Sequence, residues 1–115
     1  MLTFNKVLFT GRITDSIRVI RQGDESLVRF TLIHKEQIKL RRETKEVTTY
    51  LNCLLIGKKA EDFAANVKQG TPICVEGKLE RDPHVSIRLR VSSWQFLLPS
   101  MRELEGLSLS RGQNA

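Results

Sequence analysis

The sequence predicts an all-β fold, a five-stranded Greek-key barrel with one short helix between the third and fourth strands. Two observations predict it. The stretch from Tyr50 to Gly77 has the pattern of a strand, a helix and a second strand, with glycines at the changes of direction. Elsewhere, apolar and polar residues alternate with period two, as in strands buried on one face. With 115 residues, 40% of them hydrophobic, the composition predicts one folded domain over residues 1–98.

The first two predicted strands precede residue 35. In residues 5–14 the positions of one face are apolar or glycine: Val7, Phe9, Gly11 and Ile13. The extended pattern continues through residues 16–22 to a turn at Gly23. Residues 27–34 form the second predicted strand, whose apolar face consists of Val28, Phe30 and Leu32.

Residues 35–45 interrupt this alternation with a concentration of positive charge. The basic residues of the segment are Lys35, Lys39, Arg41, Arg42 and Lys45. One interpretation is a solvated loop at the tip of a long hairpin. The other is a basic finger along a phosphate backbone, where each neutralised phosphate releases counterions. We favour the finger, because five basic against two acidic residues supply +3 of the net charge of +6.

The third strand and the helix follow. Residues 49–56, TYLNCLLI, are dense in β-branched, aromatic and aliphatic side chains, and Gly57 breaks the strand. After it, apolar residues recur at helical spacing on one face: Ala60, Phe63, Ala64 and Val67. We expect Gly70 to end this helix as a C-cap.

The last two strands are predicted in residues 72–80 and 84–98. The first bends at Gly77, because glycine inside a strand marks a barrel corner. The second has an apolar face of Val85, Ile87, Leu89 and Val91. Trp94 and Phe96 fall out of phase with that face, which predicts a bulge near Ser92 and Ser93. Trp94 and all five phenylalanines (Phe4, Phe9, Phe30, Phe63 and Phe96) are expected in the core.

The remaining features favour a binding protein over an enzyme. No nucleophile has a nearby base, and no cofactor, metal or small-molecule substrate is indicated. Cys53 and Cys74 fit no metal or disulfide framework, and no signal or membrane-spanning segment is apparent, so we expect a cytoplasmic protein. Nothing in the sequence indicates membrane association. Residues 99–115 are expected to form a short, flexible tail.

Five strands with a helix between the third and fourth is the order of the OB-fold. The chain resembles the bacterial single-stranded DNA-binding proteins in five segments that occur in the family's order: NKVLFTGRIT, VRFTLIH, LNCLLIGKKAED, VKQGTPICVEGKLE and WQFL. The resemblance covers about residues 5–98. It implies an OB barrel that forms a homo-oligomer, either a dimer or a tetramer, and binds single-stranded DNA in replication, recombination or repair.

The resemblance also assigns positions where the family stacks bases on aromatic rings. These positions hold Ile38, Tyr50, Ile56 and His84, so Tyr50 is the clear stacking platform. Charge is expected to compensate, and the further candidate phosphate ligands are Lys58, Lys78, Arg81, Arg88 and Arg90. The family's acidic C-terminal tip is absent from SLSRGQNA, so its recruiting role is not implied.

Two other interpretations stay open. A primosomal OB-fold protein, which helps restart replication, resembles the single-strand binders with fewer aromatics and no acidic tail. Short relatives from cyanobacteria and plastids, some of them associated with internal membranes, are a variant of the same class. A structural subunit would keep the barrel but use its outer face and edge strands for protein contacts.

Overall fold

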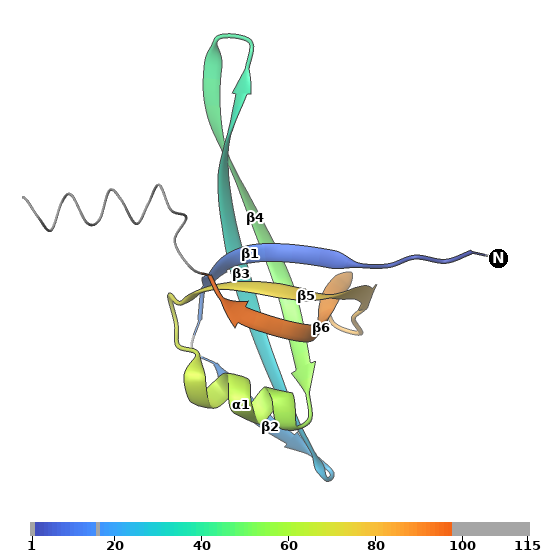
Figure 1. Cartoon of the computed structure of the whole chain (residues 1–115). Helices are drawn as coiled ribbons and strands as arrows, with labels where there is room; N and C mark the ends of the chain where they lie inside the picture. Colours follow the sequence, from blue (N-terminus) through green and yellow to red (C-terminus); the bar gives the residue numbers. More distant parts are fainter. Residues whose placement is uncertain (1, 16, 98–115) are drawn as a thin grey trace, which may run out of the picture.

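The computed structural model describes residues 2–15 and 17–97 (Figure 1). The strands are β1 (Val7–Ile13), β2 (Arg18–Gln22), β3 (Glu25–Leu40), β4 (Glu43–Ile56), β5 (Pro72–Arg81) and β6 (Ile87–Phe96), with α1 (Lys58–Asn66) between β4 and β5. The OB-fold barrel is therefore confirmed, with β1 and β2 as two parts of its first strand. The predicted tail, residues 99–115, lies outside the described residues.

The sheet has the order β1-β5-β6-β4-β3-β2, and β1 closes the barrel by pairing with β3 as well as β5. Near Gly11, β1 passes from one neighbour to the other. A Cβ atom on Gly11 would lie 2.7 Å from the Ile33 carbonyl oxygen. Glycine is therefore required where the two backbones approach each other to close the barrel.

The core lies between the barrel wall and the buried face of α1. Ala60, Phe63 and Val67 are buried, as the helical spacing predicted. The Phe63 ring stacks on Phe30 with centroids 4.5 Å apart and meets Trp94 edge-on at 5.2 Å. Trp94 therefore packs against the core as expected. At nine residues, α1 falls far short of a membrane-spanning helix, and the described residues contain no other candidate.

The predicted end of the helix at Gly70 is wrong. The last helical hydrogen bond runs from the Val67 amide to the Phe63 carbonyl, and Val67 already has an extended backbone. Burial of the Val67 side chain draws the chain back to the barrel. Gly70, at φ 85°, instead forms a later turn whose amide donates to the Ile13 carbonyl at 2.8 Å.

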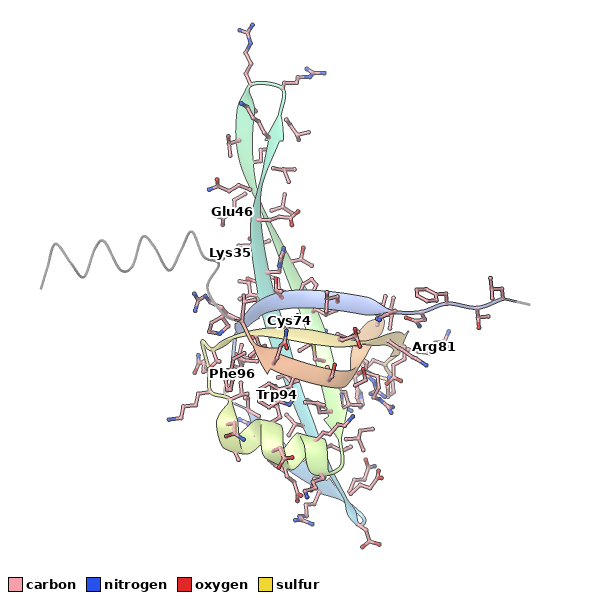
Figure 2. All side chains as sticks on the ribbon, in the orientation of Figure 1. Lys35, Glu46, Cys74, Arg81, Trp94 and Phe96 are labelled. Carbon is pink, nitrogen blue, oxygen red and sulfur yellow. The ribbon has the colours of Figure 1, made fainter. Side chains whose placement is uncertain are left out.

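Residues 35–45 are not a loop, as one interpretation had them. β3 and β4 pair without a break from Leu27↔Ile56 to Leu40↔Glu43, and only Arg41 and Arg42 form the turn. The outer part of this hairpin, residues 35–48, is called the arm below. It projects from the barrel on the side opposite α1 (Figure 1), with Lys35 and Glu46 on its shaft (Figure 2).

Four expected core residues are exposed. Phe4 precedes β1, and Val85 lies in the loop between β5 and β6, so neither has a strand to direct it inward. Ile87 and Phe96 occupy the two ends of β6 at the barrel rim and are also exposed. Phe96 rests edge-on against Trp94, with centroids 5.3 Å apart. The apolar face of β6 therefore reduces to Leu89 and Val91, with Trp94 beyond the bulge.

The predicted bulge and the predicted bend are the same feature. Glu76 pairs with Ser93 and Gly77 with Val91, so Ser92 is the extra residue of β6. Its hydroxyl donates to the Glu76 carbonyl at 3.0 Å. A Cβ atom on Gly77 would lie 2.1 Å from the Arg90 carbonyl oxygen. The bulge brings the Trp94 side chain back to the core side of the sheet.

We expect Gly77→Ala to lower the free energy of unfolding by about 3 kcal/mol or more, because its methyl group would meet backbone atoms that cannot move away. The matched control is Gly23→Ala, at φ 65° with open space around it. It should lose only about 1–2 kcal/mol, the cost of the left-handed backbone. Urea unfolding of the three proteins compares these values, and equal losses would contradict the steric explanation.

Candidate nucleic-acid interface

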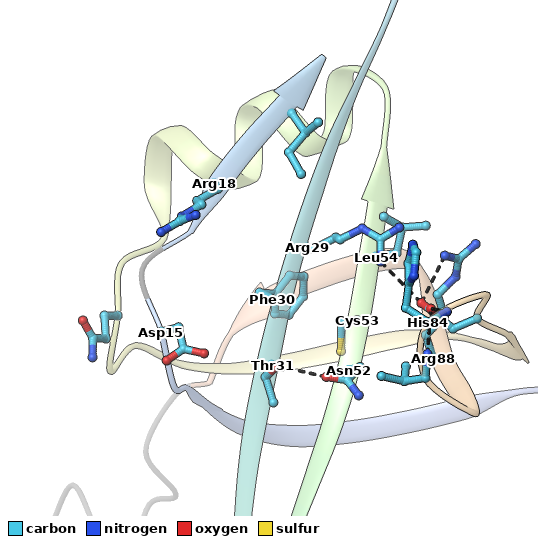
Figure 3. A pocket seen from close by; sticks show the side chains of 14 residues that line it. Asp15, Arg18, Arg29, Phe30, Thr31, Asn52, Cys53, Leu54, His84 and Arg88 are labelled. Atoms are coloured by element: carbon cyan, nitrogen blue, oxygen red, sulfur yellow. Dashed lines mark hydrogen bonds and ion pairs between the residues drawn. The ribbon is translucent and has the colours of Figure 1, made fainter. Parts of the chain in front are cut away.

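An open groove of about 620 Å³ crosses the outer face of β2, β3 and β4 and ends at the loop of residues 82–86 (Figure 3). Its polar and charged lining includes Arg18, Arg29, Thr31, Asn52, Asp82 and Arg88. Side chains alternate along a strand, so Arg29 and Thr31 face outward while Phe30 fills the core. The groove is thus the solvent side of the wall whose inner side packs on α1.

Asp82 organises the end of the groove. Its carboxylate is buried and accepts hydrogen bonds from the amides of His84, at 2.7 Å, and Val85, at 3.1 Å. It also pairs with Arg88 at 3.2 Å and with Arg29 at 3.5 Å. The backbone hydrogen bond from His84, together with the other donors, lowers the pKa of Asp82. The loop is therefore held in place by an anion at neutral pH, and it directs His84 into the groove.

Arg88 and Arg90, both predicted phosphate ligands, have partners within the chain. Arg88 donates to Glu80 and Asp82, and its side chain is only 14% exposed. Arg90 pairs with Glu80 at 3.1 Å but stays 42% exposed. Partial burial alone would raise the pKa of Glu80, yet the hydrogen bond from Arg88 and the charges of both arginines lower it. Arg88 therefore serves first to hold the loop, while Arg90 retains an accessible edge.

Beyond the groove, the outer face of the hairpin continues along the arm. Tyr50 lies opposite Ile33, and its side chain is 65% exposed. Lys35 and Lys39 follow on the same face by alternation, and both are exposed. Lys45 pairs with Ile38, so these two lie on the other face of the arm. The predicted basic residues are thus divided between two faces.

The arm ends in two adjacent arginines. Arg41 and Arg42 form the turn, and both are exposed. Arg41 has φ 57°, the one positive φ among the described non-glycine residues. Glycine or asparagine adopts this backbone at lower cost, by about 1–2 kcal/mol. Two guanidinium groups are therefore presented at the tip at some expense in stability.

His34 fixes the arm at its root. Its ring nitrogens lie 2.8 Å from the Thr10 carbonyl oxygen and 3.0 Å from Glu36, and its ring packs against Phe9 with centroids 5.1 Å apart. The hydrogen bond with Glu36 and then that with Thr10 raise the pKa of His34. A protonated imidazole donates from both nitrogens, so it satisfies both partners at once. The arm is thereby tied to β1 as well as to its own two strands.

The other predicted ligands do not join this face as one cluster. Lys58 is the first residue of α1, and Arg81 is the last residue of β5. Lys78 lies opposite Arg90 in the ladder between β5 and β6. Of the positions matched to the family's aromatics, Tyr50 and Ile56 share the outer face, Ile38 lies on the opposite face of the arm, and His84 lines the groove. The described residues therefore offer one exposed aromatic ring along the hairpin.

Several groove residues were absent from the predicted set. Arg18, Arg29 and Asn52 line the groove from outward positions of extended segments. The alternation in the sequence therefore already indicated that their side chains face outward. Asp82 gave no such signal, because its partners Arg29 and Arg88 come from different strands. Among the described residues, no group of histidine, cysteine and carboxylate side chains could hold a metal ion.

Comparison with known proteins agrees with this architecture. A sequence model described as "Single-strand binding protein family" matches residues 4–85. A single-stranded DNA-binding protein of Aquifex aeolicus is 31% identical over 80 residues, which cover 68% of this chain and 54% of that protein. The chain spans about half the length of the curated relatives that it matches.

Solved structures share the fold at lower identity. The small single-stranded DNA-binding protein from Streptomyces coelicolor superimposes with a TM-score of 0.73 at 15% identity, covering 85% of this chain and 96% of that one. The protein PriB from Ralstonia solanacearum gives a TM-score of 0.68 at 16% identity, covering 84% of this chain and all (100%) of that one. At these identities the likeness shows the fold.

Proposed function

The chain belongs to the single-strand binding protein family, and we propose that it binds single-stranded DNA without catalysis, in replication, recombination or repair. The observation that carries the proposal is the continuous outer face of β3 and β4. It joins the groove to Tyr50 and then to the lysines and arginines of the arm. Non-specific single-strand binders combine cations that contact phosphates with aromatic rings on which bases stack. The outer face presents both along one path.

Electrostatics provide most of the affinity in this proposal. Lys35, Lys39, Arg41 and Arg42 lie on or at the end of the outer face, where all four side chains are exposed. The left-handed backbone of Arg41 supports a functional role for the tip, since strained positions persist where they serve function. With one exposed aromatic ring on the hairpin, binding should depend strongly on salt.

The test is a titration of labelled single- and double-stranded oligonucleotides at about 50 and 200 mM salt. We expect preference for the single strand and a linear fall of log affinity with log salt. Arg41→Glu should reduce the magnitude of that slope by about 0.7 or more, one lost phosphate contact. Lys68→Glu, an exposed cation on the turn after α1, is the matched control and should leave the slope unchanged. Equal weak binding to both duplex and single strand would contradict the proposal.

Tyr50→Ala should weaken single-strand binding by about 1–3 kcal/mol if a base stacks on the ring. Tyr50→Phe keeps the ring and should bind as the parent protein does. Because the Tyr50 side chain is largely exposed, neither change should unfold the barrel, which circular dichroism verifies. Unchanged affinity of Tyr50→Ala would remove Tyr50 from the interface.

We also propose a homo-oligomer formed through the outer strands. Leu8, on the outer face of β1, is 69% exposed. It borders a surface hollow whose lining includes the uncharged residues Cys74, Ser93 and Gln95 and one carboxylate, that of Glu76. The carboxylate of Glu76 is paired with Lys6 at 3.3 Å. An exposed leucine beside mostly uncharged side chains has the composition of an interface centre.

Leu8→Glu should therefore convert the oligomer to a single chain, because it would bury an unpaired charge between subunits. Light scattering measures the mass. Leu40→Glu, at another exposed strand position, on the arm, is the control and should keep the oligomeric mass. A parent protein that already has the mass of one chain would refute the oligomer.

The alternatives predict different outcomes. A replication-restart OB protein would bind the same strands and differ in the proteins it contacts. A structural subunit would be insensitive to changes at both Tyr50 and Arg41. The opposite face of the arm favours keeping this second alternative, because it exposes the aliphatic side chains of Leu40 and Val47.

A further inference from the structure

One amide side chain lies in a defined orientation beside the exposed ring of Tyr50. Asn52 is directly opposite Thr31 in the ladder, and the Thr31 hydroxyl donates to Asn52 Oδ1 at 3.1 Å (Figure 3). Both residues line the groove. Asn52 and Tyr50 are two positions apart on β4, so they share the outer face about 7 Å from each other. At this separation, Asn52 is the nearest side chain toward the groove along β4, on the face where a base would stack on Tyr50.

The hydrogen bond from Thr31 decides which end of the amide faces the groove. With Oδ1 engaged by the hydroxyl, the NH₂ group of Asn52 points away from Thr31, and the described residues provide it with no hydrogen-bond acceptor. An asparagine with both ends free reads adenine, which offers a donor beside an acceptor. Thr31 thus occupies one of the two lone pairs of Oδ1 and leaves the NH₂ group as the free end of the Asn52 amide. Its donors then face the groove in the manner of the lysine and arginine that read guanine.

The nearest residue pairs on the same face of the ladder complete the arrangement. Ile33 and Tyr50 lie on one side of the Thr31–Asn52 pair, and Arg29 and Leu54 lie on the other. Arg29 supplies a cation that is 43% exposed although it pairs with Asp82. The ring of Tyr50, the amide of Asn52 and the guanidinium group of Arg29 therefore follow one another along the outer face. The other amide in the groove, Gln69, differs because its NH₂ group already donates to the Thr14 carbonyl at 3.0 Å.

We propose that Asn52 reads the base edge next to Tyr50 and gives the chain a preference for bases with two adjacent acceptors over adenine. Cytosine offers N3 and O2, and guanine offers N7 and O6. Thymine has an N–H donor between its two carbonyl acceptors, so its expected affinity lies between that of cytosine or guanine and that of adenine. The proposal rests on the proposed single-strand binding, to which it adds selectivity at one position.

The experiment compares labelled dC and dA oligonucleotides of equal length at pH 8 and one salt concentration, with the parent protein and Asn52→Leu. In the parent, the ratio of the Kd for dA to the Kd for dC should exceed that of Asn52→Leu by about 5-fold or more. Comparing ratios between proteins removes the difference in stacking between the free oligonucleotides. Asn52→Leu should lower the ratio by weakening dC binding.

Thr31→Val provides the second arm of the experiment. It keeps the shape of the side chain and removes the hydroxyl, so both ends of the Asn52 amide become free. The ratio should again fall, this time because dA binds more tightly. Asn52→Ala repeats the test should the leucine disturb folding, which thermal melting detects.

Equal dA-to-dC ratios in all the variants would overturn the inference while leaving single-strand binding in place. Absence of binding of the parent protein to both oligonucleotides would instead refute the proposed function. The two failures are therefore distinguishable within one set of titrations.

Discussion

The antiparallel ladder between β3 and β4 is the constraint on which the rest of the structure depends. It runs unbroken from the barrel wall to the tip of the arm. Because side chains alternate along both strands, the register that buries Phe30 and Cys53 also fixes the faces of Tyr50 and Lys35, far from the core. A slip of one residue would turn the proposed binding face inward. Core packing thus determines the position of the candidate interface.

Local patterns predicted the elements whose spacing was regular. Ala60 and Phe63 recur at helical spacing, and their burial followed. The out-of-phase Trp94 predicted the bulge that Gly77 and Ser92 form. The arm was missed as a strand pair because its charged residues concealed the alternation of Ile38 and Leu40. Phe4 and Phe96 were misplaced because an apolar residue at a strand end has no neighbouring wall to cover it.

The candidate site was predictable in part. The resemblance to the family indicated Tyr50, and the concentration of positive charge indicated the lysines of the arm. The loop anchored by Asp82 was not predictable, since Arg29 approaches it from β3, which is remote in sequence, and Arg88 from the following strand, β6. Arg88 was predicted to contact phosphate because the alternation places it on the outward face. The alternation does not reveal which carboxylates lie beside it on the adjacent strand and loop. Cross-strand contacts, rather than composition, decide which cations remain accessible.

The arm has a further consequence for the behaviour of the protein in solution. Beyond the barrel it is a two-stranded ribbon, and no other strand of the described residues pairs with either of its edges. Open edges are templates for pairing with other chains. Its exposed aliphatic side chains, Leu40 and Val47, add to that tendency. The interspersed lysines and glutamates repel such neighbours. The charges proposed to contact DNA therefore also keep the arm from self-association. Neutral substitutions along it would favour aggregation, whereas charge reversal would not.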